Sequence, residues 1–402
     1  MKKVIALILA LALVFSFAAC SKKTTGEPAK TETDSNASSE TTTTEETTAS
    51  DDTLYIGVAA PITGDMAETG VMMDVASRMA VEEINANGGV NGRKLALVLY
   101  DTKADPKEST EVARNFVEDS RIIAVCGDTT TSQVMAAAPI YEEGGLVQCT
   151  PTASGNDVPA MGKYQFSMAG RAADEVPKYV QNVLGDALNC QRLGIIYLNN
   201  DWGAEIKNSV EAECETAGIE IVTIESFMDG ETDFTSALTK MRQADPDVLL
   251  LAAQYTEGSL IAQQVEQMGW DIPLTTQGSL VQPAFCSLAP ADMTYLGQCP
   301  IVFTEEIPDA YEFAQKFAGY EGSGGIQPSL RAAATYNTIN VLAEAISRCG
   351  DDVTRENVRD QLAQIKDFPI LGGTTVTFSE EGYVNLQYVT VTIRDGQWVP
   401  YK

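Results

Sequence analysis

The chain has 402 residues, a length that suits two domains, and 44% of its residues are apolar while 21% are charged. Its formal net charge of -29 argues against nucleic acid as a partner, because phosphate binding needs clustered Lys and Arg. Histidine is absent, which removes the commonest general base and the commonest metal ligand. Composition therefore predicts a globular protein and argues against an enzyme, and we expect no cofactor and no metal.

The first 20 residues have the pattern of a bacterial lipoprotein signal peptide. Lys2 and Lys3 precede an apolar run of 16 residues, which is short for a membrane span, and Cys20 follows in FAAC. This tetrapeptide resembles a lipobox, whose Cys becomes lipidated, although Phe17 replaces the usual Leu. Both this interpretation and the alternative of an uncleaved anchor attach the chain to the cell membrane, on its extracytoplasmic face.

Residues 21–52 consist largely of Thr, Ser and Glu. Such a segment cannot bury enough apolar surface to offset chain entropy, so we expect a disordered tether. Beyond Cys20 there are seven cysteines, with no CxxC and no metal-like spacing. We expect most of them to be buried thiols, and Cys286 with Cys299 is the one disulfide pairing worth testing.

Strands and helices alternate from residue 54 onward. Strands are expected over 54–62, 94–101, 122–128, 146–151, 192–200, 219–227, 247–254, 272–278 and 299–306. Helices are expected between them over 70–89, 105–119, 131–145, 175–188, 202–218, 234–245 and 258–269, with three more between 310 and 366. Residues 374–402 read as alternating strands and turns. The order predicts an α/β fold with parallel sheets covered by helices on both faces, restarting near Arg171 as a second unit.

Hydroxyl groups gather where two consecutive strands end. GDTTTSQ places Thr130, Thr131 and Ser132 between a strand and a helix, and TPTASGND places Thr152 and Ser154 after the next strand. Ligands of open parallel sheets bind beyond the carboxyl ends of the strands, and a helix N-terminus there offers unpaired N–H groups to an anion. The alternative is that these residues are ordinary caps and turns. Two clusters at equivalent strand ends favour a site for a small carboxylate.

Four stretches carry a family resemblance: IGVAAPITGDMAETG, AVEEINANGGVNGRKLALVLYD, GDTTTSQVMAAAPIYEEGG and TPTASGNDV. In this order they resemble the branched-chain amino acid type of ABC-transporter solute-binding protein. The resemblance implies the type I periplasmic-binding fold, with two Rossmann-like lobes, a three-strand hinge and a ligand cleft. Lobe 1 would comprise residues 53–170 and about 301–373, and lobe 2 about 171–300 and 374–402.

The resemblance also implies roles for individual residues. Thr131 matches the residue whose hydroxyl and backbone N–H hold the ligand carboxylate. Thr152 matches the residue whose carbonyl faces the ligand ammonium, and Ser154 matches a hydroxyl that contacts both groups. Trp202 and Tyr255 stand where aromatic side chains cover the rest of the ligand.

Two positions depart from the family pattern. Thr69 replaces an aromatic residue of the side-chain pocket, and Gln277 stands where amino acid binders often carry Asp or Glu. A buried ammonium ordinarily wants a charged partner. Glu257, Asp128 or Glu305 would have to substitute, or the ligand is a carboxylate or amide without an ammonium group.

These observations predict a lipid-anchored, monomeric receptor that captures an apolar or aromatic amino acid, or a related carboxylate, and delivers it to an ABC permease. A sensory ligand-binding protein is the alternative that the sequence leaves open. An enzyme is disfavoured, because GxSxG, HExxH and Walker motifs are all missing from the sequence.

Overall fold

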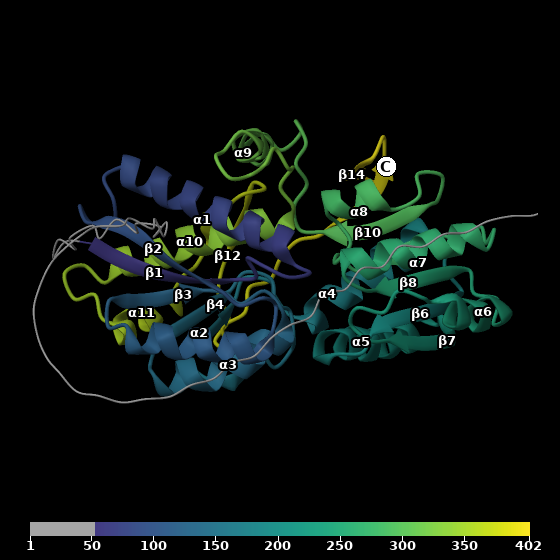
Figure 1. The fold of residues 1–402 in the computed structure, drawn as a ribbon, viewed down its shortest axis with the longest axis horizontal. Coiled ribbons are helices and arrows are strands. Elements are labelled where there is room, and N and C mark those ends of the chain that lie inside the picture. The colour runs from purple at the N-terminus through teal and green to yellow at the C-terminus, as the bar shows by residue number, and fades with distance from the viewer. Residues whose placement is uncertain (1–52) are drawn as a thin grey trace, which may run out of the picture. The chain divides into compact units, whose positions relative to one another are not determined.

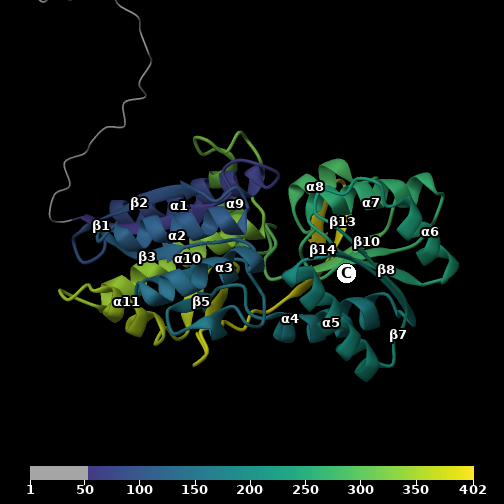
Figure 2. The ribbon, with the colours of Figure 1, turned by 60° about the horizontal axis from the view of Figure 1, so that its bottom comes forward.

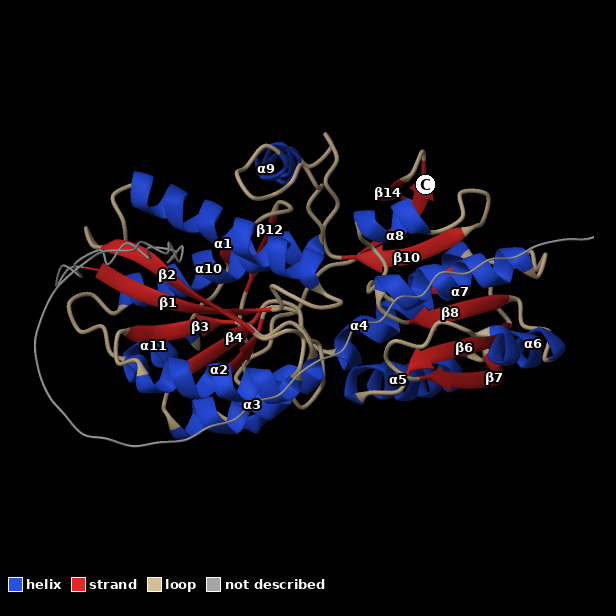
Figure 3. Cartoon of the chain, in the orientation of Figure 1, coloured by secondary structure: helices blue, strands red, loops and turns tan. Residues whose placement is uncertain are grey.

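The computed structural model describes residues 53–402. The predicted signal peptide over 1–20, with Cys20, and the predicted tether over 21–52 lie outside the described residues. Two β-sheets, each covered by helices on both faces, form two α/β lobes (Figure 1; Figure 3). Among residues 53–402 there is no helix that combines the length and the apolar character required to cross a lipid bilayer.

The first lobe is built on a five-stranded parallel sheet of order β2-β1-β3-β4-β5. Its strands are β1 (Thr53–Ala60), β2 (Lys94–Asp101), β3 (Ile122–Cys126), β4 (Val147–Thr150) and β5 (Gln165–Ser167). Its helices are α1 (Ala67–Ala86), α2 (Pro106–Glu118), α3 (Thr131–Glu143), α9 (Pro308–Ala318), α10 (Leu330–Arg348) and α11 (Arg355–Leu362), with a 3-10 turn at Pro159–Met161. Helices α1 and α10 cover one face, and α2 and α3 cover the other (Figure 1). Every residue of β3 and β4 is buried, as expected for central strands covered on both faces.

The second lobe contains a seven-stranded sheet of order β14-β13-β10-β9-β8-β6-β7. Its strands are β6 (Arg192–Leu198), β7 (Glu220–Phe227), β8 (Val248–Ala252), β9 (Leu274–Thr276), β10 (Tyr295–Cys299), β13 (Val389–Arg394) and β14 (Gln397–Pro400). Its helices are α4 (Ala172–Tyr179), continued by a π-helix (Val180–Ala187), α5 (Asp201–Ala217), α6 (Thr235–Gln243), α7 (Tyr255–Gln267) and α8 (Pro283–Leu288). Strands β6 to β10 run parallel, whereas β13 and β14 add an antiparallel edge (Figure 2).

The strand predicted over 299–306 is misplaced. The sheet contains Tyr295–Cys299 as β10, and residues 300–306 have no regular structure. Pro300 explains the boundary, because proline has no N–H to donate to a central ladder. The segment after Pro300 is instead a crossover that carries the chain to α9 in the first lobe.

The final crossover also falls later than the predicted boundary at 373/374. Strand β12 (Thr374–Val376) pairs with β11 (Phe368–Ile370) in a separate hairpin. Val376, Phe378 and Val384 then pack in the core that lies between the first sheet and α1 and α10. This packing favours a return to the second lobe between Val384 and the start of β13.

The seven cysteines of the described residues are all free thiols. The pairing considered for Cys286 and Cys299 is therefore absent. Cys299 lies at the buried end of β10, where its thiol donates to the carbonyl of Ile301 at 2.8 Å. Cys286 lies on α8 and is partly buried.

Arg355, the first residue of α11, connects this helix to the C-terminal end of α2 and the start of β3. The guanidinium of Arg355 donates to backbone carbonyls in the segments that close α2 and α3 and open β3, at 2.8–3.4 Å; the acceptors are Phe116, Val117, Asp119, Ile122 and Gly144. Carbonyls at helix ends lack intrahelical partners, so these bonds satisfy acceptors that would otherwise be left open.

Replacing Arg355 with Met should therefore lower the free energy of unfolding by about 2–4 kcal/mol, because several carbonyls lose a charged donor at once. Urea unfolding followed by circular dichroism measures the change. Arg114→Met is the matched control: its partner is the exposed Glu111, so its loss should stay below about 0.5 kcal/mol. Equal losses of unfolding free energy in the two variants would contradict a stabilising role of the Arg355 hydrogen bonds.

Candidate functional site

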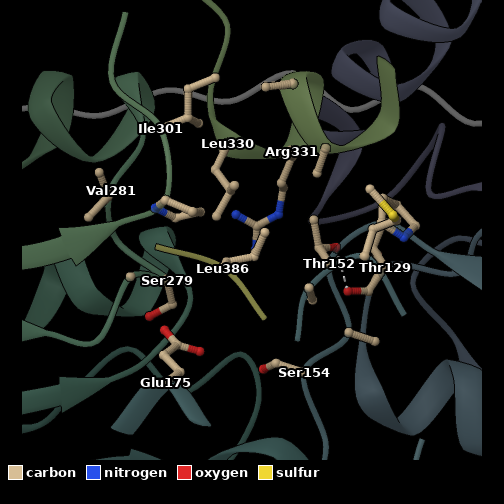
Figure 4. Close-up of a pocket in the computed structure, with 18 of the residues that line it drawn as sticks. Thr129, Thr152, Ser154, Glu175, Ser279, Val281, Ile301, Leu330, Arg331 and Leu386 are labelled. Atoms are coloured by element: carbon tan, nitrogen blue, oxygen red, sulfur yellow. Dashed lines mark hydrogen bonds between the residues drawn. The ribbon is translucent and has the colours of Figure 1, made fainter. Parts of the chain in front are cut away.

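A pocket lies between the two lobes at the carboxyl ends of the parallel strands. It encloses about 1260 Å³, including open solvent at its mouth. From the first lobe it is lined by the segments after β3, β4 and β5 and by the start of α10, and from the second lobe by the segments after β6, β8 and β9. This is the position where open α/β sheets bind ligands. Figure 4 shows side chains from both lobes pointing into it.

The passage from β3 to α3 leaves polar groups without protein partners. Thr130 is the N-cap of α3: its Oγ1 accepts from the Gln133 N–H at 3.4 Å and donates to Gln133 Oε1 at 3.0 Å. The hydroxyl of Thr131 is buried and makes no hydrogen bond. The backbone N–H groups of Thr131 and Ser132, in the first turn, have no acceptor in the described structure. The Thr130 hydroxyl thus caps the helix, whereas the backbone N–H groups of the next two residues have no acceptor.

Of the other predicted hydroxyl groups, two form hydrogen bonds within the protein and one does not. Thr152 Oγ1 donates to the Thr129 carbonyl at 2.9 Å, and Ser132 Oγ donates to Asp201 Oδ2 of the second lobe at 3.0 Å. Ser154 is buried, lines the pocket, and its hydroxyl makes no hydrogen bond within the described residues. All five predicted hydroxyl residues line the pocket, but only Thr131 and Ser154 have hydroxyls without a partner among the described residues.

Close backbone approach brings the two hydroxyl-bearing segments together. Thr150 Oγ1 donates to the Asp128 carbonyl at 2.6 Å, which joins the end of β4 to the end of β3. A Cβ atom at Gly155 would lie 2.4 Å from Thr131 Cγ2, so only glycine fits there without displacing Thr131. The predicted convergence of two strand ends on one site is therefore a property of the backbone as well as of the side chains.

Of the residues predicted to contact the ligand from the second lobe, some line the pocket and one does not. Trp202, at the start of α5, and Gln277, after β9, both line the pocket. Tyr255 does not line it: its hydroxyl donates to the Asp65 carbonyl at 3.4 Å, across to the first lobe. Thr69 is buried and also lies outside the lining, so it does not shape this pocket.

None of the acidic residues considered as substitutes for a family Asp or Glu reaches the pocket. Asp128 is fully buried behind it, where Ser109 donates to its carboxylate at 3.1 Å and Gln148 at 3.3 Å. Glu257 is buried outside the lining, and Glu305 is exposed. No three acidic or cysteine side chains of residues 53–402 are gathered as metal ligands.

The acid that does line the pocket is Glu175, in the first turn of α4. Its Oε1 lies 3.5 Å from where a Cβ at Gly278 would stand, next to Gln277. Burial raises its pKa to about 8, although Gln298 and Lys178 favour the charged form. Sequence reasoning missed Glu175 because an acid in the first turn of a helix is ordinarily explained by the helix dipole.

The pocket also contains an unpredicted cation, Arg331. It is the second residue of α10, and its side chain extends from the helix into the pocket (Figure 4). One terminal nitrogen donates to Gln254 Oε1 of the second lobe at 3.0 Å, while the buried Nε has no partner. A signal for it existed, because a basic residue at a helix N-terminus opposes the dipole and so calls for another explanation.

Asp128 makes the stability of the segment behind the site depend on pH. Burial raises its pKa to about 7, and the hydrogen bond from Ser109 opposes this. Because the folded-state pKa exceeds the unfolded value, the folded protein holds the proton more tightly, and this stability is lost as pH rises from about 4 to about 7.

Asp128→Asn should remove that loss. Between pH 5 and pH 8 the free energy of unfolding of the unmodified protein should fall by roughly 1–3 kcal/mol more than that of the variant. Gln148 can turn its amide to accept from the new side chain, because its Oε1 is unpaired. Urea unfolding at the two pH values measures this difference. The same pH dependence in both proteins would show that Asp128 is charged when folded.

Comparison with known proteins identifies the family. The model of the periplasmic binding protein family matches residues 53–397. An amino acid binding protein of Pseudomonas aeruginosa is 27% identical over 301 residues, which cover 74% of this chain and 79% of that protein. The leucine-, isoleucine-, valine-, threonine- and alanine-binding protein of the same organism is 27% identical over 303 residues, covering 75% and 79%.

Solved structures agree with the sequence comparison. The branched-chain amino acid transporter substrate-binding protein LivJ of Streptococcus pneumoniae, in complex with isoleucine, superposes with a TM-score of 0.76 at 26% identity. The match covers 87% of this chain and all of that one. This chain has the type I periplasmic-binding fold and belongs to the periplasmic binding protein family, so it is a ligand-binding receptor and not an enzyme.

Proposed function

We propose that this protein captures a small amino acid or a related carboxylate in the pocket between its lobes and delivers it to the membrane subunits of an ABC importer. One observation carries the proposal. The N–H groups of Thr131 and Ser132, with the hydroxyls of Thr131 and Ser154, are donors without acceptors beside one pocket. The names of the similar proteins support the ligand class and the importer.

These donors suit a carboxylate. The N-terminus of α3 carries partial positive charge, so an anion there is stabilised without Arg or Lys. Hydrogen bonds to a charged acceptor contribute about 1.5–3 kcal/mol each, and a micromolar dissociation constant corresponds to about -8 kcal/mol. A few such bonds together with burial against Trp202 are sufficient for that affinity.

Glu175 supports an ammonium group on the ligand. It places a carboxylate beside the neutral Gln277, in the second-lobe wall of the same pocket. No ion-pair partner of Glu175 is found among the described residues, so an ammonium would meet an unpaired acid. A non-amino organic acid or an amide remains the alternative ligand, and binding would then keep Glu175 protonated.

Delivery requires the two lobes to hold the ligand together. Hydrogen bonds already cross between them at the pocket, from Ser132 to Asp201 and from Arg331 to Gln254, each at 3.0 Å. The Asn156 N–H donates across to Glu205 Oε2 at 3.0 Å as well. We propose that hinge closure on the ligand forms these bonds, and that a lipid anchor at Cys20 keeps the monomeric receptor at the membrane. Handing the closed form to a sensory receptor is the alternative, which an importer gene beside this one would disfavour.

The proposal is tested by screening amino acids and simple carboxylates against the purified protein by thermal shift, then titrating the ligands that stabilise it by calorimetry. Thr131→Val should weaken binding of a stabilising ligand about 10- to 100-fold, because a hydroxyl donor is lost at nearly constant volume. Since that hydroxyl is unpaired without ligand, the melting temperature of the free protein should not fall.

The matched control is Thr130→Val, one residue earlier. It removes the cap of α3 and should cost about 1 kcal/mol of stability. Its effect on affinity should stay within about threefold, since the Thr130 hydroxyl is already engaged. No stabilising compound in the screen, or a larger affinity loss from Thr130→Val than from Thr131→Val, would contradict the proposed site.

The pH dependence of binding reports on the ammonium group. Because the pKa of Glu175 is raised to about 8, a proton competes with a ligand ammonium below that pH, and affinity should rise toward pH 8 by up to about tenfold per unit. Calorimetry should show proton release on binding. Glu175→Gln should abolish the dependence, and an analogue with hydrogen in place of the ammonium should lack it. An amino acid whose affinity is flat from pH 6 to 8 would exclude Glu175 as the partner.

A further inference from the structure

We infer that the ligand carries a second anionic group and that Arg331 binds it, so that the receptor selects an acidic amino acid over the apolar ones that similar proteins are named for. This inference rests on the proposed function, because it assumes that the ligand occupies the same pocket. It concerns a part of the pocket that the hydroxyl cluster and Glu175 do not serve.

Arg331 is half-buried, with its Nε shielded from solvent, yet it lacks a carboxylate partner. The partly exposed Arg78 and Arg171, by contrast, each hold a nearby aspartate at 2.7 Å. No carboxylate of residues 53–402 forms an ion pair with Arg331, and its single hydrogen bond is to the neutral amide of Gln254. Glu68 is close enough only for a through-space effect on the pKa values of both groups. Most of the guanidinium donors are therefore open to a ligand.

The location makes an unpaired Arg331 unfavourable in the free protein. Burial lowers its pKa, which expresses the cost of desolvating the cation. The side chain also sits in the first turn of α10, where the helix dipole repels positive charge. An anion in the pocket would offset both costs, whereas an apolar ligand side chain would bury the guanidinium without compensation.

The pocket places its charged groups at separate points. Figure 4 shows Arg331 entering from α10, Glu175 with Ser279 on the second-lobe side, and Ser154 with Thr152 on the first-lobe side. A molecule with one carboxylate for the hydroxyl side, one ammonium for Glu175 and a further carboxylate for Arg331 matches this arrangement.

Apolar lining strengthens the expected pairing at Arg331. Leu330, Ile301 and Leu386 line the same part of the pocket and are buried or partly buried. They would exclude water from an ion pair formed there, and a guanidinium–carboxylate pair is stronger when water is excluded. The same side chains could contact only the short methylene chain of an acidic amino acid, which is compatible with its size.

Isothermal titration with L-glutamate, L-glutamine and L-leucine tests the inference. Glutamate and glutamine have the same shape and differ in side-chain charge, so the unmodified protein should bind glutamate at least about tenfold more tightly than glutamine or leucine. Arg331→Met keeps an apolar stem, and it should weaken glutamate binding about 10- to 100-fold while changing glutamine binding less than about threefold. Arg331→Lys keeps the charge and should lie between them. L-aspartate, titrated in parallel, reports the preferred chain length.

Gln254→Leu is the control for a merely structural role. It removes the hydrogen bond that Arg331 makes across the pocket but leaves the cation. If Arg331 only joins the lobes, Arg331→Met and Gln254→Leu will weaken all three ligands equally, and the inference is wrong. Leucine or glutamine binding as tightly as glutamate would also overturn it, while leaving the proposed function intact when Thr131→Val still weakens that binding. If no amino acid or carboxylate binds, the proposed function itself fails.

Discussion

A helix that starts directly after a buried parallel strand must leave backbone N–H groups without intrahelical acceptors. At the start of α3 the chain satisfies only part of this requirement. Thr130 caps the Gln133 N–H, yet the N–H groups of Thr131 and Ser132, two residues that line the pocket, have no acceptor in the described structure. In a mobile loop, these N–H groups would form hydrogen bonds with water or with other groups of the loop. Here the buried strands β3 and β4 hold them in place, which is why we propose these unsatisfied positions as a preformed anion site.

The lobes contribute complementary parts of the pocket. The first lobe supplies the open donors of Thr131 and Ser154, and the second supplies Glu175 and Gln277. Neither set encloses a ligand by itself, because each lies at the edge of its own sheet. The crossovers near Arg171, after Cys299 and before β13 keep the two edges facing each other while passing through little regular structure. An arrangement of this kind couples ligand capture to the approach of the lobes, since bonds from both walls are made only when the walls meet.

The architecture was predictable because strand and helix periodicity, glycine stops and parallel-sheet rules are local properties. The predictions failed at one local signal that was overlooked, a proline, and at a boundary that a distant contact decides. Cys299 ends β10 because Pro300 cannot extend the ladder, and Val376 and Phe378 join the first core through contacts with strands far away in the sequence. Within the site, composition located the hydroxyl clusters. It could not show that the Thr130 hydroxyl caps the helix while the Thr131 hydroxyl has no partner, because that depends on which side chain forms the hydrogen bonds with Gln133.

Electrostatics explains why the missed residues are the charged ones. Glu175 and Arg331 both lie in the first turn of a helix, where an acid is expected and a base is not. Glu175 could therefore not be told apart in the sequence from acids that only stabilise a helix N-terminus. Arg331, in contrast, opposes the preference of helix N-termini for negative charge. A residue that opposes local preference, is removed from water and lacks a carboxylate partner costs stability in the free protein. Such a cost is tolerated at functional positions when a bound partner compensates it. For that reason, in the function we propose, the charge pattern of this pocket should determine which ligand it accepts more than its apolar lining does.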